Sequence, residues 1–165
     1  MLKSLNREIM SKGFIVISAL FTGFAIPSKF SVTTTPSLVH RIFFIRGKPD
    51  GKESLKGKYV LFHLPAQYIP ARYAGKKHLP VIKRVECEGG DTLKVREKSF
   101  FCNGIYLGEA KLYSLTGESL EHFIFNGTIA QGKVFVMGDH KDSLDSRYFG
   151  FLETNDIEAV VLPVF

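Results

Sequence analysis

Short apolar runs separated by turn residues dominate the chain beyond residue 30. Runs rich in Val, Ile, Phe and Tyr are typical of β-strands rather than helices. On this basis, strands are predicted at residues 38–45, 59–64, 81–85, 92–95, 100–102, 105–107, 123–125, 133–137 and 157–164. The pattern predicts a mainly β domain that spans residues 31–165.

Glycine-rich and proline-rich segments predict how these strands connect. Gly89-Gly90-Asp91 is typical of a tight turn, and Asn103-Gly104 is typical of a two-residue hairpin. The polar run at residues 31–36 is predicted as a turn that leads into the first strand. Residues 65–80 hold three prolines, which predicts a surface loop with one helical turn. Around residues 92–107 the connections favour an antiparallel meander.

The first thirty residues follow a different pattern. Lys3, Arg7 and Lys12 precede an uncharged stretch at residues 13–28. At ~1.5 Å per residue this stretch would form a helix of roughly 24 Å, which is short for a hydrocarbon core of ~30 Å. We expect residues 1–30 to be a single-pass N-terminal transmembrane helix, with residues 31–165 on the extracytoplasmic side. A cleaved secretory signal is the alternative, because residues 23–25 fit a small-x-small cleavage pattern.

Composition and charge are compatible with the predicted β domain and the predicted N-terminal membrane segment. With 165 residues, of which 45% are hydrophobic, the chain is long enough for one domain with a packed core. The net charge of +6 is compatible with a nucleic-acid partner or with an anionic membrane surface. Part of this charge lies in the N-terminal segment, and the remainder shows no interleaving of basic and aromatic residues. We therefore expect membrane lipid as a partner, and no nucleic acid.

Two cysteines, Cys87 and Cys102, lie on neighbouring predicted strands. In an exported domain they would meet an oxidising compartment, where a bridge closing such a loop contributes ~3 kcal/mol in the chain-entropy model. Two small buried thiols are the alternative. The number and spacing of the cysteines do not predict a zinc site.

The densest group of polar side chains lies at residues 137–151, between an apolar strand and an aromatic run. The chain contains no G-x-S-x-G elbow, no H-E-x-x-H helix, no S-x-x-K motif and no Walker loop. Its five histidines are scattered, so a histidine-dependent triad is not predicted. From the residues alone, the polar group at 137–151 is compatible with an Asx-rich turn that serves only structure.

A family resemblance changes this interpretation. Residues 138–147 read GDHKDSLDSR and closely resemble the G-D-N-x-x-x-S-x-D-S-R box of type I signal peptidases, the Ser/Lys proteases of the S26 class. Residues 81–91 resemble the box that supplies a general-base lysine, and residues 33–38 resemble the box that supplies a serine. The segment at residues 56–62 resembles the strand box between these two. The resemblance covers essentially the whole chain and implies a coiled antiparallel β-sheet catalytic core.

The resemblance also implies a role for each matching residue. Ser37 takes the place of the nucleophile, and Lys83 takes the place of the general base. The backbone amide of Ser37 and the hydroxyl of Thr35 take the place of the oxyanion hole. Ser143 takes the place of the serine that orients the lysine. The supporting positions around them are filled by Asp145, Arg147, Gly138, Asp139 and Ser146.

Elementary acid–base chemistry sets a condition on Lys83. A serine hydroxyl becomes a good nucleophile when a base removes its proton, and a lysine is a base only when it is uncharged. Burial disfavours the ammonium form, so Lys83 is expected to be buried. Arg84 is expected to point to the opposite face of the strand, into water. This chemistry requires no cofactor and no metal.

Within the family, the chain resembles the TraF-type peptidases of conjugative transfer systems. The compact plan, the threonines before Ser37 and the paired cysteines carry this resemblance. It implies an enzyme of the bacterial cytoplasmic membrane, with its catalytic domain on the periplasmic side. The expected partners are exported precursors, of which pilin-type subunits are the first candidates.

Three other functions are alternatives to a conjugative signal peptidase. A general housekeeping signal peptidase would use the same residues on a wider set of precursors. A LexA-like self-cleaving protein shares the Ser/Lys chemistry, but a DNA-binding module would be expected before it and no helix-turn-helix pattern is present. A membrane-tethered β domain without catalytic activity is the alternative from a different class of protein.

Overall fold

The computed structural model describes residues 29–35, 37–51, 53–70, 73, 75, 78–114, 117 and 119–165. Strands make up most of this part of the chain, with short helical turns between them. The elements are β1 (Phe30–Val32), β2 (Ile42–Gly47), β3 (Tyr59–His63), η2 (Ala66–Tyr68), β4 (Pro80–Glu88), β5 (Thr92–Arg96), β6 (Ser99–Cys102), β7 (Ile105–Glu109), β8 (Asn126–Thr128), β9 (Lys133–Met137), α2 (Ser146–Phe149), β10 (Leu152–Glu153), η4 (Thr154–Asp156) and β11 (Ile157–Pro163).

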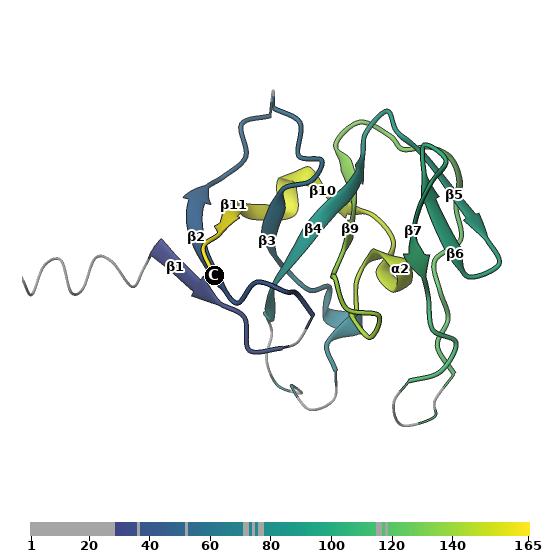
Figure 1. The fold of residues 1–165 in the computed structure, drawn as a ribbon, viewed down its shortest axis with the longest axis horizontal. Helices are drawn as coiled ribbons and strands as arrows, with labels where there is room; N and C mark the ends of the chain where they lie inside the picture. The colour runs from purple at the N-terminus through teal and green to yellow at the C-terminus, as the bar shows by residue number, and fades with distance from the viewer. Residues whose placement is uncertain are drawn as a thin grey trace, which may run out of the picture.

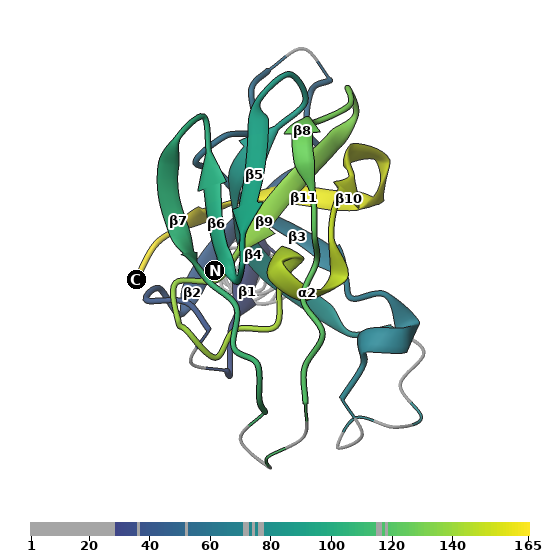
Figure 2. The same cartoon turned by 90° about the vertical axis from the view of Figure 1, so that its right-hand side faces the viewer.

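The strands form two antiparallel sheets. The larger sheet has the order β1-β2-β11-β3-β4-β9-β10, and the smaller has the order β7-β6-β5-β8. Figure 1 shows the larger sheet on the side where β1 begins and the smaller sheet at the opposite side of the molecule. Figure 2, turned by 90°, shows β7, β6, β5 and β8 side by side. Strand β4 lies between β3 and β9 in the larger sheet, and the chain passes from it through a short turn into β5 of the smaller one.

Alternating apolar positions build the core between and beneath these sheets. Strand β3 alternates between half-buried and buried residues, as expected when one face of a strand packs inward. By contrast, four of the five residues of β9 are buried, because the strand lies between its neighbours with both faces covered. One buried cluster centres on Val60, Phe62 and Val136, and a second, which includes Phe100 and Phe135, packs beneath the smaller sheet.

A disulfide links the two sheets. Cys87 on β4 and Cys102 on β6 are joined, with their Cα atoms 6.0 Å apart. Both residues are buried, at 0% and 3% exposed. Of the two states left open by the sequence, the structure therefore has the bridged one.

Most predicted strands are present, and the differences lie at particular positions. The strand expected at residues 38–45 begins only at Ile42, because Leu38 and its neighbours form a loop. The strand expected at residues 123–125 is wrong, since β8 begins at Asn126. Within the polar run at residues 31–36, predicted as a turn, Ser31 and Val32 belong to β1, which pairs with β2. The hairpin turn at Asn103-Gly104 is confirmed, with φ values of 49° and 82°.

The predicted membrane anchor at residues 1–30 lies almost entirely outside the described residues. Lys29 and Phe30 are its described members, and Phe30 begins β1. Within the part of the chain that the structure describes, no helix combines the length and the apolar character needed to cross a bilayer.

Candidate active site

Ser37 lies in a loop between β1 and β2 that is held by hydrogen bonds and by one buried side chain. The Thr33 amide donates to the Arg41 carbonyl at 2.9 Å, which closes the loop at its base. Leu38, the residue after Ser37, is 3% exposed and packs with Phe43 in a third buried cluster. The Val39 amide donates to Asp139 Oδ2 at 3.0 Å. The position of Ser37 is therefore set by a buried neighbour and by a contact from a distant part of the chain.

Lys83 projects from the middle of β4 into the protein interior. Its partner in register is Val60 on β3, and its neighbour Ile82 is also buried. Lys83 is 4% exposed, and its Nζ donates a hydrogen bond to Ser143 Oγ at 2.7 Å. The side chain of Arg84 is 44% exposed and pairs with Glu86, so the expected alternation of faces is confirmed.

Burial lowers the pKa of Lys83 from its ordinary value of 10.5 to about 8. Desolvation of the ammonium is the largest cause, because the apolar surroundings stabilise it less than water does. The carboxylate of Asp145 acts in the opposite direction, and the guanidinium of Arg147 lowers the pKa further. Near neutral pH a substantial minority of Lys83 side chains is therefore uncharged, as a general base requires.

A turn at residues 138–143 contacts both the serine loop and the lysine. The His140 amide donates to the Ser37 carbonyl at 3.2 Å, while Ser143 accepts the hydrogen bond from Lys83. A side chain at Gly138 is excluded by this packing: a Cβ placed there would lie 2.7 Å from the Ser37 carbonyl oxygen and 2.7 Å from Ser143 Cβ. The turn thus joins the two residues that the sequence singles out for catalysis.

A buried ion pair between Asp145 and Arg147 supports the turn from the protein interior. Arg147 donates to both carboxylate oxygens of Asp145, at 2.9 and 2.8 Å, and the two side chains are 3% and 0% exposed. Asp145 also accepts from the Gly138 amide at 2.9 Å, and Arg147 donates to the Ser143 carbonyl at 3.3 Å. Ser146 accepts from the Val136 amide at 2.9 Å. Four of the predicted supporting residues are therefore brought together, buried and hydrogen-bonded: Gly138, Asp145, Ser146 and Arg147. The fifth, Asp139, is exposed and accepts from the Val39 amide.

The contacts around Ser37 differ in one respect from the roles that the resemblance implies. The hydroxyl groups of Thr35 and Ser37 lie 3.1 Å apart and share a hydrogen bond. No hydrogen bond joins Ser37 directly to Lys83, although both residues are described. The Ser37 amide has no acceptor among the described residues, so it is available to a ligand. The arrangement can present a hydroxyl, an amine and an amide donor to one substrate.

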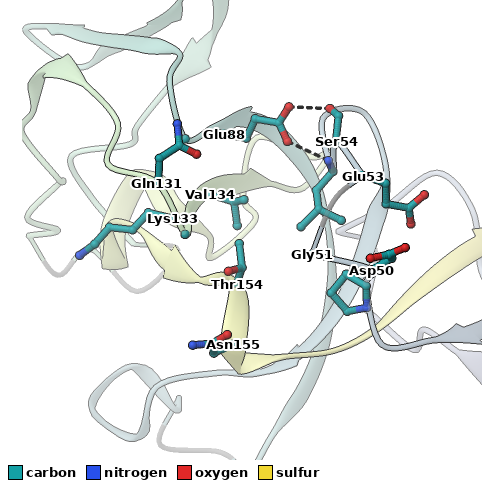
Figure 3. Close-up of a pocket in the computed structure, with 14 residues that line it drawn as sticks. Asp50, Gly51, Glu53, Ser54, Glu88, Gln131, Lys133, Val134, Thr154 and Asn155 are labelled. Carbon is teal, nitrogen blue, oxygen red and sulfur yellow. Dashed lines mark hydrogen bonds between the residues drawn. The ribbon is translucent and has the colours of Figure 1, made fainter.

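A cavity of about 340 Å³ lies elsewhere in the larger sheet, between the turn after β2 and the start of β11 (Figure 3). None of the residues predicted for catalysis lines it. The Glu88 carboxylate faces the cavity but accepts hydrogen bonds from Ser54 and from the Leu55 amide. This carboxylate therefore fixes the turn before β3.

One group of side chains in the described part of the chain is spaced for a metal: Cys87, Cys102 and Asp91. The two sulfurs are bonded to each other, so they offer no thiolate ligands in this state.

Several residues that hold the site were not predicted. Leu38 anchors the serine loop, and its burial has no signal beyond its apolar character. The backbone of His140 binds the Ser37 carbonyl, which no side-chain pattern could indicate. Lys111 forms an ion pair with Asp142 of the turn, although it lies far from that turn in the sequence. A sequence motif indicates only which residue types occur at given spacings. The contacts of Leu38, His140 and Lys111 depend instead on how distant segments pack.

A family model and a curated relative agree with the resemblance in the sequence. The family model described as "Signal peptidase, peptidase S26" matches residues 7–165. Signal peptidase I V of Bacillus subtilis (strain 168) is 32% identical over 124 residues, which cover 68% of this chain and 74% of that protein. A signal peptidase I from Enterococcus faecalis V583, with a crystal structure, is 25% identical, covers 67% of this chain and 98% of its own, and gives a TM-score of 0.43.

Proposed function

Because the chain belongs to the signal peptidase S26 family, we propose that it cleaves signal peptides from exported precursors with a Ser37/Lys83 dyad. Members of this family are serine peptidases that act on exported precursor proteins and are generally associated with membranes. The observation that carries the assignment of the base is the burial of Lys83 at 4% exposed, with its pKa lowered to about 8.

In the proposed acylation step, the Ser37 Oγ forms a bond to the carbonyl carbon of the scissile peptide. Its proton passes to Lys83 Nζ. The Ser37 amide and the Thr35 hydroxyl donate to the oxyanion, and each donor is worth roughly 3 kcal/mol in such a step. When the C–N bond breaks, the proton on Lys83 moves to the departing amine.

In the proposed deacylation step, Lys83 takes a proton from water, and the resulting hydroxide attacks the ester carbon. Ser37 then leaves with the proton. Throughout both steps Ser143 holds Lys83 Nζ by the hydrogen bond of 2.7 Å. The amine therefore stays oriented while its charge changes, and no cofactor takes part.

Two substrate classes follow from different observations. The threonines before Ser37 and the Cys87–Cys102 bridge support a pilin-type precursor of a conjugative transfer system. The similarity to signal peptidase I V of Bacillus subtilis favours a wider set of secretory precursors. We propose the pilin-type precursor as the first substrate to test, with the catalytic domain outside the cytoplasmic membrane and residues 1–30 as its anchor.

The test compares cleavage by membranes that contain the wild type, Ser37→Ala or Lys83→Ala. The substrates are a pilin precursor from the same genetic system and an ordinary secretory precursor. Lys94→Ala, which removes an exposed lysine on β5, is the matched control. We expect wild type and Lys94→Ala to cut the pilin precursor, and both site variants to lose at least about a thousandfold in rate.

The possible outcomes separate the parts of the proposal. Cleavage of the secretory precursor alone would identify a general signal peptidase. Cleavage by Ser37→Ala at the wild-type rate would show that the nucleophile is a different residue. Cleavage of neither substrate by the wild type would contradict the proposed activity, provided the protein is folded by circular dichroism.

A further inference from the structure

The turn at residues 138–143 determines where the two reactive groups lie, because each of them is attached to it. The amide of His140 binds the Ser37 carbonyl at 3.2 Å, and Ser143 Oγ binds Lys83 Nζ at 2.7 Å. A movement of the turn would therefore change the distance and angle between nucleophile and base. Misplacement of reacting groups by about 1 Å can cost a hundredfold in rate.

The inner side of this turn, which faces the protein interior, is held by the buried side chains of Asp145 and Arg147. Asp145 accepts from the Gly138 amide, and Arg147 donates to the carbonyls of His140 and Ser143, at 3.4 and 3.3 Å. The outer side is different, because His140, Lys141 and Asp142 are exposed. Within this group, the Asp142 amide donates a hydrogen bond to His140 Nδ1 at 3.1 Å. The Asp142 carboxylate lies 3.7 Å from the same His140 nitrogen.

Lys111 supplies the side-chain contact that reaches this outer side from another element. It pairs with Asp142, and among the described residues no other side chain outside residues 138–147 forms a hydrogen bond or an ion pair with the side chains of residues 140–142. The hydrogen bond to Lys111 is the largest cause of the lowered pKa of Asp142. Asp142 is therefore charged at the pH where Lys83 loses its proton.

Lys111 begins an arm made of two antiparallel segments, residues 111–114 and 119–122, that extends from the smaller sheet between β7 and β8 (Figure 2). Its two sides are joined by the Tyr113–Ser119 bridge and by the Leu120 amide, which donates to the Leu112 carbonyl at 2.8 Å. In both ribbon views the two segments of the arm lie towards the same end of the molecule as the 138–143 turn (Figures 1 and 2). The first residue of the arm, Lys111, is ion-paired with Asp142 of the turn.

The base of the arm is attached to the same framework as the turn. The Glu109 carbonyl accepts from Arg147 at 2.8 Å, and the Lys111 amide donates to Tyr148 Oη at 2.9 Å. Ala110, between them, is 1% exposed. The backbone of Lys111 is thus held in place, which lowers the entropy cost of fixing its ammonium on Asp142.

From these contacts we propose that the Lys111–Asp142 ion pair positions the outer side of the 138–143 turn, and through it Ser37 and Lys83. Lys111 and Asp142 are positioning residues, because they act through the turn and do not touch the reacting atoms. The inference rests on the proposed protease function and adds to it a role for the arm. Loss of the pair is expected to lower kcat while leaving substrate binding and folding nearly unchanged.

The experiment measures kcat and KM on a precursor peptide with alanine at the first and third positions before the cut. The variants are Lys111→Met, Asp142→Asn, the double variant and Lys111→Arg. Lys133→Met is the matched control, because Lys133 forms a comparable exposed ion pair with Glu153 at 2.9 Å. Hydrogen exchange of the peptide that covers residues 138–144 is measured on the same proteins, and so is the melting temperature.

We expect Lys111→Met and Asp142→Asn each to lower kcat about tenfold, with KM changed by less than about twofold. The double variant should lose no more than either single variant, because both remove one interaction. Lys111→Arg should restore most of the activity, and Lys133→Met should behave as wild type. The turn should exchange faster in the three pair-breaking variants, at an unchanged melting temperature.

The proposal is overturned if kcat stays within twofold of wild type, if the two single losses multiply in the double variant, or if only KM changes. A fall in melting temperature parallel to kcat would assign the pair to general stability instead, and would also overturn it. If wild type cuts no precursor, the proposed function fails on its own. In that case the hydrogen-exchange rates of residues 138–144 still decide whether the Lys111–Asp142 ion pair holds the turn.

Discussion

Lys83 is the residue whose surroundings bear most directly on the proposed chemistry. It is 4% exposed, and desolvation lowers its pKa to about 8. Val60, its partner in register on β3, is fully buried, and Ser143 accepts the hydrogen bond that orients the amine. A buried lysine is thermodynamically unfavourable for the fold, so its presence points to a chemical use rather than to packing.

The lowered pKa of Lys83 predicts the pH dependence of cleavage. Because the free enzyme must hold Lys83 uncharged, kcat/KM should rise with pH and level off above a midpoint of about 8. Measurement of kcat/KM from about pH 6 to about pH 10 tests this. A midpoint near the ordinary value of 10.5 would mean that Lys83 is not the base.

The same shift predicts a pH effect on stability, with the same sign as for a carboxylate whose pKa is lowered by folding, but in an alkaline pH window. Between pH 8 and 10.5 the unfolded chain keeps the proton on Lys83 while the folded protein releases it. The free energy of unfolding should therefore rise with pH across this window, relative to Lys83→Met, by up to about 3 kcal/mol. Urea unfolding of both proteins at several pH values measures the difference. Parallel curves at all pH values would contradict the shift.

At the scale of elements, the short helix α2 is inseparable from the site. Asp145 is its N-cap, with the side chain accepting from the Arg147 amide at 3.2 Å, while the same carboxylate binds the Gly138 amide. A helix of four residues has little stability of its own. It is held by these hydrogen bonds and by the ion pair with Arg147, which explains why no helical pattern in the sequence predicts it.

Asp145→Asn is predicted to be strongly destabilising. The substitution keeps the size of the side chain but leaves the Arg147 guanidinium, 3% exposed, without its counter-charge. Removal of one partner of a buried ion pair costs about 3–5 kcal/mol. Glu153→Gln, in the exposed pair with Lys133, should cost less than about 1 kcal/mol. Equal losses for the two variants in urea unfolding would contradict this account.

At the scale of the whole molecule, the two sheets are joined by the chain between β4 and β5, by packing and by one covalent bond. The Cys87–Cys102 bridge connects β4, which carries Lys83, with β6 of the smaller sheet. The base of the arm that contacts the 138–143 turn belongs to this smaller sheet. The bridge therefore helps to hold together the two parts from which the candidate site is built.

Removal of the disulfide is predicted to lower stability without abolishing the fold. The double variant Cys87→Ala/Cys102→Ala should lose about 3 kcal/mol, as expected for a sequence separation of 15 residues. Wild type treated with a dithiol reductant under mild denaturation should lose a similar amount. Unfolding midpoints in urea provide the measurement. A double variant as stable as the oxidised protein would mean that the bridge adds nothing to the packing between the sheets.

Alternation and turn residues were sufficient to predict most of the strands. Strand β9 has the predicted bounds, and the Asn103-Gly104 turn has the expected positive φ values. The prediction failed where tertiary contacts override local pattern. The aromatic run at residues 123–125 was expected to be a strand, but its rings pack on Phe151 and the strand begins after it. Strand β1 was missed because its residues are mostly exposed and form a strand by pairing with β2.

The sequence by itself determined the class of the fold, the family and the residue types of the candidate site. It could do so because strand pattern is local and because the box at residues 138–147 is long and specific. Only the tertiary structure decided that Lys83 is buried, that the 138–143 turn joins it to the Ser37 loop, and that Lys111 reaches Asp142. Desolvation and contacts between distant segments depend on how all the strands pack together, and no local pattern in the chain encodes that arrangement.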